Sequence, residues 1–365
     1  MITKQRNHAL DFLKFIFALI ILLFHSVSLP GSATMPIFVN GRIGVEFFFL
    51  VSGCLMCASA AKIPADEPLG TDTFRFMKRK IAVLMPNYFL AYAIAFTVFH
   101  WNSGTFSPEI LLSHAIQSLP DLLLIKNSGI RAISYNGVTW YLSAMLLCML
   151  VIYPLVRKYK DIFFFIIAPA SFLFIMGNLF QNYGELSTLE YWDGHFMKGT
   201  LRATGDILGG CFCYKAGEYL RRFTFTTLGK TLFTIIEWSC YLASIAYIYA
   251  HPSSKYDYFI LLLFMIGVTI TYADVSLDRS LFRHKIFPWL GNYSFSLYLG
   301  HSCWRKYTGN IFPKTWQFEQ RLAAYIVISM LTGLFILYAS LWLRQVWTCA
   351  KPGIQKMLIE EKKQL

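Results

Sequence analysis

The sequence predicts an all-α protein, a polytopic membrane bundle of about ten transmembrane helices with both termini in the cytoplasm. The composition is the first reason: 56% of the 365 residues are hydrophobic and only 15% are charged, which is rare for a soluble domain of this size. The second reason is that apolar runs of about 20 residues, long enough to cross a bilayer as helices, recur along the chain. We therefore expect a multi-pass protein of the cell membrane.

The expected spans and their orientation follow from hydropathy and charge. Lysine and arginine are more than twice as frequent in the segments on the N-terminal side of the membrane as in those on the other side. Because cytoplasmic loops carry the excess of positive charge, both ends of the chain should lie inside. Residues 1–350 are expected to form the membrane domain and 351–365 a short cytoplasmic tail. The spans are expected at 8–29, 43–61, 81–100, 138–156, 162–180, 200–219, 232–250, 256–274, 288–304 and 322–344.

The net charge of +13 would suggest a nucleic-acid partner if the protein were soluble. No basic run alternates with aromatic residues as a nucleic-acid groove requires, so we expect membrane lipids and not nucleic acid as partners. Cys54 and Cys57 have the spacing of a redox or zinc motif, but they lie inside an expected span. Since neither a second such pair nor a histidine cluster accompanies them, no metal site is expected.

The first span carries three polar side chains that need an explanation, Asp11, Lys14 and His25. A charged group at the bilayer centre costs about 2.5–3.5 kcal/mol, so each needs a partner, a water path or a task. Lys14 and His25 are separated by almost three helical turns, which places them on one face, about 16 Å apart along the axis. Asp11 lies one turn before Lys14 on the same face.

The orientation of this helix suggests a chemical role for the stripe. Lys14 is expected near the inner face, where a cation binds phosphate. His25 is expected near the outer face, where an imidazole that titrates near neutral pH acts as a general base. The pattern favours a reaction between a phosphorylated cytoplasmic donor and an acceptor farther out. The structural alternative is that Lys14 reaches the inner lipid headgroups and that His25 lies at the outer interface.

The second span places Glu46 at its outer end, at the expected depth of His25. A carboxylate there would orient the imidazole and stabilise its protonated form, or it would be a rim group facing water. Ser52 and Gly53 follow about two turns deeper, where small residues let helices approach closely.

A basic cluster, RFMKRK (75–80), precedes the third span on the expected cytoplasmic side. Its Lys78, Arg79 and Lys80 are candidates for binding the phosphates of a nucleotide-bearing donor. Anionic lipid, or the marking of topology alone, would also account for such a cluster.

Later segments add further candidates. Trp140 opens the fourth span and His301 closes the ninth, both at the expected outer face, and we take both as candidates for binding the acceptor. Arg202 and Asp206, one turn apart in the sixth span, are expected to form an ion pair. The run 111–125 in the longest outer loop is too short and polar to span, so it should lie on the membrane or fold back into the bundle.

Four stretches together resemble the acyltransferase 3 family of integral-membrane acyltransferases, and they occur in the family's order along nearly the whole chain. Asp11-Phe12-Leu13-Lys14 followed by His25 is similar to the family's first-helix signature. The other three stretches are GVEFFFLVSG (44–53), WYLSAMLLCMLVIYP (140–154) and LGNYSFSLYLGH (290–301).

The resemblance implies a transferase that moves an acyl group, usually acetyl, from cytoplasmic acyl-coenzyme A to a hydroxyl of a cell-surface glycan or lipid-linked saccharide. It implies that His25 is the essential histidine and Lys14 the essential basic residue, with Arg79 near the donor phosphates. The chain departs from the family in one place. Val83 stands where the family's third helix carries a second arginine, three residues before Pro86, so Lys78 and Lys80 would have to substitute.

Two other classes of function stay open. A transporter or flippase of a glycan, lipid or small anion would also place ionisable residues such as Lys14 and His25 along a pathway. Such proteins usually contain inverted repeats with broken helices, and no clear repeat relates the two halves of this sequence. The third class is a non-catalytic membrane sensor or scaffold that keeps the fold.

Overall fold

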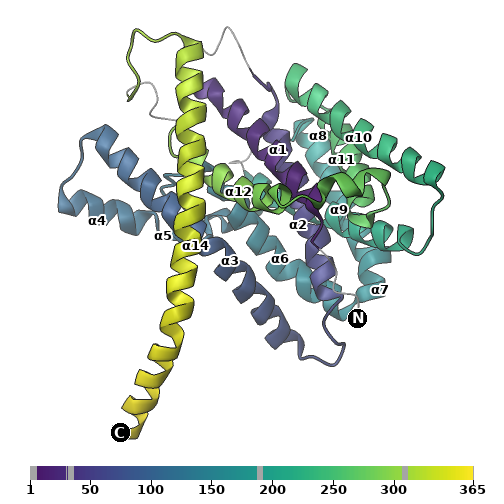
Figure 1. Cartoon of the computed structure of the whole chain (residues 1–365), viewed down its shortest axis with the longest axis horizontal. Helices are drawn as coiled ribbons and strands as arrows, with labels where there is room; N and C mark the ends of the chain where they lie inside the picture. Colours follow the sequence, from purple (N-terminus) through teal and green to yellow (C-terminus); the bar gives the residue numbers. More distant parts are fainter. Residues whose placement is uncertain (1–5, 30, 32–36, 187–191, 306–310, 365) are drawn as a thin grey trace.

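The computed structural model describes residues 6–29, 31, 37–186, 192–305 and 311–364, which form one bundle of helices (Figure 1). Strands in these ranges are limited to a two-residue hairpin, β1 (Trp192–Asp193) paired antiparallel with β2 (Phe196–Met197). The predicted all-α architecture is therefore confirmed. The principal helices are α1 (His8–Phe24), α2 (Gly44–Ala60), α3 (Leu69–Ser103), α6 (Trp140–Lys158), α8 (Ala168–Tyr183), α9 (Lys198–Leu220), α10 (Thr227–Ala250), α11 (Asp257–Ala273), α12 (Ile286–His301) and α14 (Phe318–Gln364).

Each predicted span coincides with one of these helices, but fewer of them qualify as membrane spans by length and composition. In the described part of the chain seven helices qualify, and an eighth is the pair formed by α11 and the 3₁₀ helix η7 (Leu277–Arg283), bent by 73°. The two remaining helices differ for physical reasons. α9 carries several ionisable side chains and many glycines, and α12 has only 16 residues.

α1 and α12 pack along each other, and this contact positions the site. At one end of the pair, the side chain of Asp11 lies directly against the backbone of Gly291. A Cβ atom at Gly291 would overlap the Asp11 carboxylate, so the contact needs glycine. On its other side, α1 packs Phe17 against Phe47 of α2, with ring centroids 4.5 Å apart, in the main core.

α2 and α9 cross at backbone contact distance. A Cβ atom at Gly53 would overlap the carbonyl of Ile207, and one at Gly210 would overlap the carbonyl of Leu50. The predicted packing role is thus confirmed for Gly53: the absent side chains let the two backbones meet.

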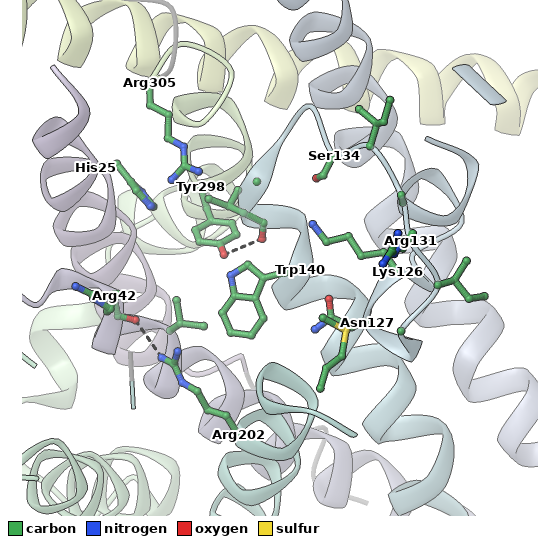
Figure 2. Close-up of a pocket in the computed structure, with 18 of the residues that line it drawn as sticks. His25, Arg42, Lys126, Asn127, Arg131, Ser134, Trp140, Arg202, Tyr298 and Arg305 are labelled. Atoms are coloured by element: carbon green, nitrogen blue, oxygen red, sulfur yellow. Dashed lines mark hydrogen bonds between the residues drawn. The ribbon is translucent and has the colours of Figure 1, made fainter. Parts of the chain in front are cut away.

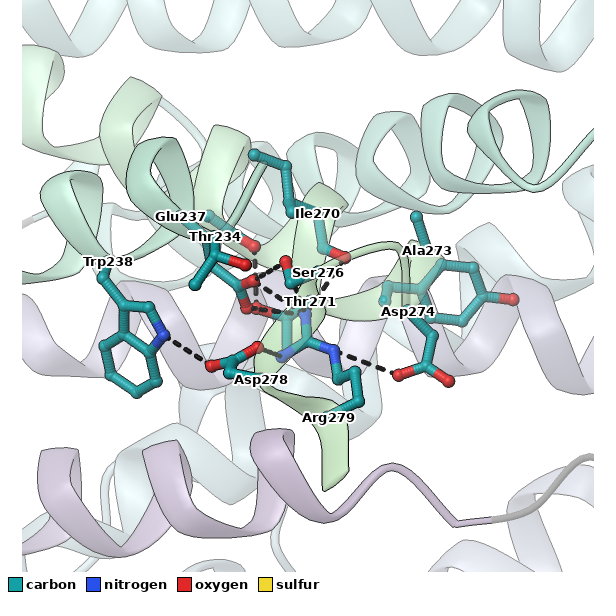
Figure 3. Close-up of polar contacts among 12 residues, drawn as sticks. Thr234, Glu237, Trp238, Ile270, Thr271, Ala273, Asp274, Ser276, Asp278 and Arg279 are labelled. Carbon is teal, nitrogen blue, oxygen red and sulfur yellow. Dashed lines mark hydrogen bonds and ion pairs between the residues drawn. The ribbon is translucent and has the colours of Figure 1, made fainter. Parts of the chain in front are cut away.

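A polar network holds the bend between α11 and η7 (Figure 3). Arg279 of η7 pairs with Glu237 of α10 at 2.7 Å and with Asp274 at 3.1 Å. The same short helix receives the start of α1, because Nδ1 of His8 lies 2.8 Å from the carbonyl oxygen of Phe282. The N-terminal end of α1 is therefore held against η7, the short helix that the network fixes.

Of the two alternatives for the run 111–125, the structure shows the return into the bundle, and only for the second part of the run. α4 (Pro108–Gln117) has no buried residue, whereas α5 (Leu119–Leu122) folds back and buries Asp121. The Asp121 carboxylate accepts hydrogen bonds from Thr139 (2.8 Å) and Ser134 (3.0 Å), and burial raises the pKa of this carboxyl above its ordinary value. The returning segment, which leads to α6, covers one side of the site.

The C-terminal helix α14 is much longer than the predicted span at 322–344. It runs through Pro352 as far as Gln364, so the predicted tail is the continuation of this helix. Figure 1 shows its end projecting away from the other helices.

Candidate active site

Cavities lie near both ends of α1, and we name them by the predicted orientation of this helix. The outer cavity, of about 960 Å³, includes His25 in its wall. Two inner cavities, of about 750 Å³ and 360 Å³, share Arg6 and Lys14 in their walls. Lys14 and His25 therefore open onto different cavities near the two ends of one helix, as their spacing predicts.

His25, directly after the last residue of α1, is paired with His301 at the end of α12. Nδ1 of His25 lies 2.9 Å from Nε2 of His301, and the two rings are stacked with centroids 5.0 Å apart. On its other side, Nδ1 of His301 lies 3.2 Å from the carbonyl oxygen of Leu297. Two residues predicted separately, one as a base and one as an acceptor-binding group, thus form a single unit.

The hydrogen bonds of this unit determine where the protons lie when both imidazoles are neutral. The Leu297 carbonyl can only accept, so Nδ1 of His301 carries a proton and its Nε2 has a lone pair. Nδ1 of His25 must then donate to that lone pair, which leaves Nε2 of His25 unprotonated. This arrangement gives His25 the basic nitrogen that a general base needs.

Glu46 does not take the orienting role predicted for it. Both of its carboxylate oxygens bind the guanidinium of Arg202: Oε2 accepts from Nη2 at 2.5 Å, and Oε1 accepts from Nε. Both side chains are fully buried. The close crossing of α2 and α9 brings the carboxylate to the fork of the guanidinium, a geometry that favours a bidentate pair.

The prediction that Arg202 forms an ion pair with Asp206 is also wrong, because Arg202 binds Glu46 instead. Arg202 is engaged by Glu46, and neither carboxylate oxygen of Asp206 has a hydrogen-bond partner within the described residues. Arg202 thus pairs with Glu46 on a neighbouring helix and not with Asp206, one turn away on its own helix.

At the inner end, Asp11 holds two cations. Its Oδ1 lies 3.6 Å from Nζ of Lys14, and its Oδ2 lies 2.5 Å from Nε of Arg6. Arg6 also donates to Oδ1 of Asn292 at 2.9 Å. Sequence reasoning missed Arg6, although a basic residue directly before a helix on the cytoplasmic side was a signal that could have indicated it.

The three candidates from the basic cluster before the third predicted span, Lys78, Arg79 and Lys80, do not lie in one site. Lys80 lies in the wall of the smaller inner cavity together with Lys14. Lys78 and Arg79 are exposed and are not among the described residues that line it.

Arg344 of α14 lies where the sequence lacks the expected arginine. Its Nη2 donates to the carbonyl oxygen of Val83 at 2.6 Å and to Oδ1 of Asn87 at 3.3 Å. Val83 and Arg344 both line the smaller inner cavity. A guanidinium is therefore present beside Val83, but it belongs to a residue 261 positions later in the chain. No local sequence signal could have indicated this contact.

Tyr298 of α12 lies in the walls of both the outer cavity and the smaller inner cavity. Its hydroxyl donates to the carbonyl oxygen of Val138 at 3.0 Å, and its ring centroid is 5.8 Å from that of His301. Trp140, predicted to bind the acceptor, lines the outer cavity next to Tyr298 (Figure 2). The outer cavity and the smaller inner cavity thus share the side chain of Tyr298, which lies close to the histidine pair.

The chain matches a known protein family. A family model described as an acyltransferase domain, acyltransferase 3, covers residues 7–343. No curated protein and no solved structure matches the chain. The matched segment contains the histidine pair and every residue that lines the outer cavity. Of the residues that line the inner cavities, Arg6 and Arg344 lie just outside it.

Proposed function

This chain belongs to the acyltransferase 3 family of membrane acyltransferases, and we propose that it transfers an acetyl group from cytoplasmic acetyl-coenzyme A to a hydroxyl of a cell-surface glycan or lipid-linked saccharide. The main support is the histidine pair beside the junction of two cavities. His25 has an orienting partner and opens onto the outer cavity, and Tyr298 connects that cavity to one lined with cations.

The inner cations suit the phosphates of coenzyme A. Arg6, Lys14, Lys80 and Arg344 all line the smaller inner cavity. Guanidinium groups bind phosphate through two parallel hydrogen bonds, and ammonium groups bind it as point charges. Asp11 stabilises this cluster by placing a negative charge between Arg6 and Lys14.

Beyond the cations, the wall of the smaller inner cavity becomes apolar and aromatic. This part of the wall includes Phe48, Leu142 and Met145 as well as Tyr141 and Tyr298. An extended, largely uncharged pantetheine arm matches such a lining better than the nucleotide does. The length of α1 between Lys14 and His25, about 16 Å, is a distance that the arm can bridge.

The proposed chemistry is a direct acyl transfer. Nε2 of His25 removes the proton of the acceptor hydroxyl, whose oxygen attacks the thioester carbonyl carbon. The carbon–sulfur bond then breaks, and the departing sulfur takes the proton from His25 to give coenzyme A and the acetyl ester. His301 acts as a positioning residue, because its hydrogen bond to Nδ1 holds the ring and stabilises the imidazolium. A covalent acyl-histidine would use the same Nε2 atom.

Acyl transfer can be tested on the full chain in nanodiscs, with radiolabelled acetyl-coenzyme A and a panel of glycans. His25→Ala should lower the rate of acetyl transfer by about 10²- to 10⁴-fold, the usual contribution of a general base. His251→Ala, which removes an exposed histidine at the end of α10, is the matched control. Movement of a solute into liposomes without any acyl transfer would instead support the transporter.

A further inference from the structure

The outer cavity is strongly cationic. Five basic residues line it and none of its described lining residues is an aspartate or glutamate. Glu46 neutralises one of the five, Arg202, through their buried ion pair. Asp121 attracts Lys126 from outside the lining. The five residues are Arg42, Lys126, Arg131, Arg202 and Arg305.

Two of these guanidinium groups lie near His25. Figure 2 shows Arg305 directly beside the imidazole and Arg42 farther along the same wall. Arg305 packs closely on the backbone of Gly137, where a Cβ atom would lie only 2.7 Å from its Nη2. Arg42 lies 5.3 Å from the ring centroid of Phe24, and its buried Nε has no hydrogen-bond partner among the described residues. Carboxylates outside the cavity wall, Glu185 first among them, attract Arg42. Because no described lining residue is acidic, an anionic occupant would still gain favourable contacts with both guanidinium groups.

The rest of the lining is suited to a saccharide. Trp140, Trp192 and Tyr298 present aromatic surface to the cavity, against which the C–H faces of a sugar ring can pack. Asn127 and Ser134 add groups that hydrogen-bond to hydroxyls. A phospholipid headgroup would satisfy the cations, but it would leave most of this aromatic surface without a partner.

We propose that the acceptor is an acidic saccharide, one that carries carboxylate or phosphate groups, and that Arg305 and Arg42 bind one of these groups beside His25. The inference rests on the proposed function, because it names the class of acceptor that the acyltransferase uses. The acidic group fixes the sugar so that a neighbouring hydroxyl meets Nε2 of His25. Lys126 and Arg131, on the opposite wall of the cavity, bind the next acidic group along the saccharide.

Binding can be measured without acetyl-coenzyme A, since Trp140 and Trp192 line the cavity and report on it by fluorescence. The full chain in phosphatidylcholine nanodiscs is titrated with oligogalacturonate, with its carboxyl-reduced neutral counterpart, and with a phosphorylated oligosaccharide. We expect at least one acidic oligosaccharide to bind about tenfold to a hundredfold more tightly than the neutral one. Equal affinity for the acidic and neutral probes would overturn the proposal, as would tighter binding of short-chain phosphatidylglycerol.

Variants assign this preference to the two arginines. Arg305→Gln and Arg42→Gln should each remove most of the preference without changing the affinity for the neutral oligosaccharide, and Arg305→Lys should restore part of it. Lys255→Gln, which removes an exposed charge outside the cavity, should keep the full preference. Size-exclusion profiles and thermal unfolding show whether each variant is folded. If a folded Arg305→Gln, Arg42→Gln double variant keeps the preference, the proposal is wrong.

A final transfer assay separates this inference from the function on which it rests. If the carboxyl-reduced oligosaccharide accepts acetate as well as the acidic one does, the acidic acceptor is wrong and the acyltransferase function stands. If the acidic oligosaccharide binds selectively but no glycan receives acetate, the proposed acetyl transfer fails while the cavity's selectivity for acidic sugars is retained.

Discussion

Nδ1 of His25 lies 2.9 Å from Nε2 of His301, a residue 276 positions later in the chain. The carbonyl oxygen of Leu297 fixes the tautomer of His301, and His301 in turn fixes that of His25. The pair has the logic of a base and its orienting group, with a neutral imidazole where other enzymes use a carboxylate.

This relationship predicts how substitutions at His301 affect the reaction. His301→Ala should lower kcat by about 10²- to 10⁴-fold with little change in the KM for acetyl-coenzyme A, because the tautomer of His25 is no longer fixed. His301→Gln should recover part of the rate, since its amide oxygen can accept the proton of Nδ1. Steady-state kinetics on both variants checks this. Equal losses in the two variants would indicate that His301 only fills space.

Arg344 should contribute to donor binding. Arg344→Ala should raise the KM for acetyl-coenzyme A by about tenfold or more with a smaller effect on kcat, because a charge-assisted contact to phosphate is lost. Arg344→Lys should lie between wild type and alanine. The matched control is Arg222→Ala, an exposed arginine at the inner face, which should leave KM unchanged. An unchanged KM in Arg344→Ala would exclude Arg344 from the donor site.

Glu46 should matter for stability and not for the protonation of His25. Glu46→Gln removes the carboxylate that binds both sides of the buried Arg202 guanidinium, which should cost about 3–5 kcal/mol in the free energy of unfolding. The double variant Glu46→Met, Arg202→Met should recover much of that loss. We expect the Glu46→Gln protein that folds to keep the wild-type pH profile of activity. If a stable Glu46→Gln variant shows a shifted pH profile, the result would support the prediction from the sequence that Glu46 acts on His25.

The crossing of α2 and α9 predicts a contrast between two glycines. Gly53→Ala should destabilise the protein by about 1–3 kcal/mol, since the new methyl group overlaps the backbone of Ile207. Gly177→Ala in α8 has open space around the new atom and should be neutral or slightly stabilising. Thermal unfolding in detergent compares the two. Similar melting temperatures would show that the helices can separate at little cost.

Tyr298 should keep the donor thioester from water in the outer cavity. Tyr298→Ala removes the ring that borders both cavities and should raise the hydrolysis of acetyl-coenzyme A in the absence of an acceptor. Tyr298→Phe loses only the hydrogen bond to the carbonyl of Val138 and should stay close to wild type. Release of free coenzyme A, followed with a thiol reagent, measures the hydrolysis. No increase in the alanine variant would mean that other side chains separate the cavities.

The parts of the site that could be predicted lie within single helices. Lys14 and His25 share a face because the period of the helix is known, and Asp11 contacts Lys14 because it lies one turn away. The presence of His301 at the same end as His25 followed from the alternation of inward and outward spans. These inferences need only the helix geometry and the distribution of charge.

The parts that could not be predicted are contacts between helices. The turn spacing made Asp206 the natural partner of Arg202, whereas the close crossing of α2 and α9 made Glu46 the actual one. The guanidinium beside Val83 comes from α14, and nothing near position 83 indicates it. Such choices depend on which helices pack together, and charge and hydropathy do not specify this.

The contact between α1 and α12 has a mechanical consequence. The two helices are joined at one end by Asp11 against Gly291 and by Arg6 to Asn292, and at the other end by His25 and His301. Because these contacts lie at both ends of the pair, α1 cannot slide along α12 without breaking them, and the two helices move as one body. His25 and His301 therefore keep their mutual position when the pair moves, and Tyr298, which lies on α12 and borders both cavities, moves with them.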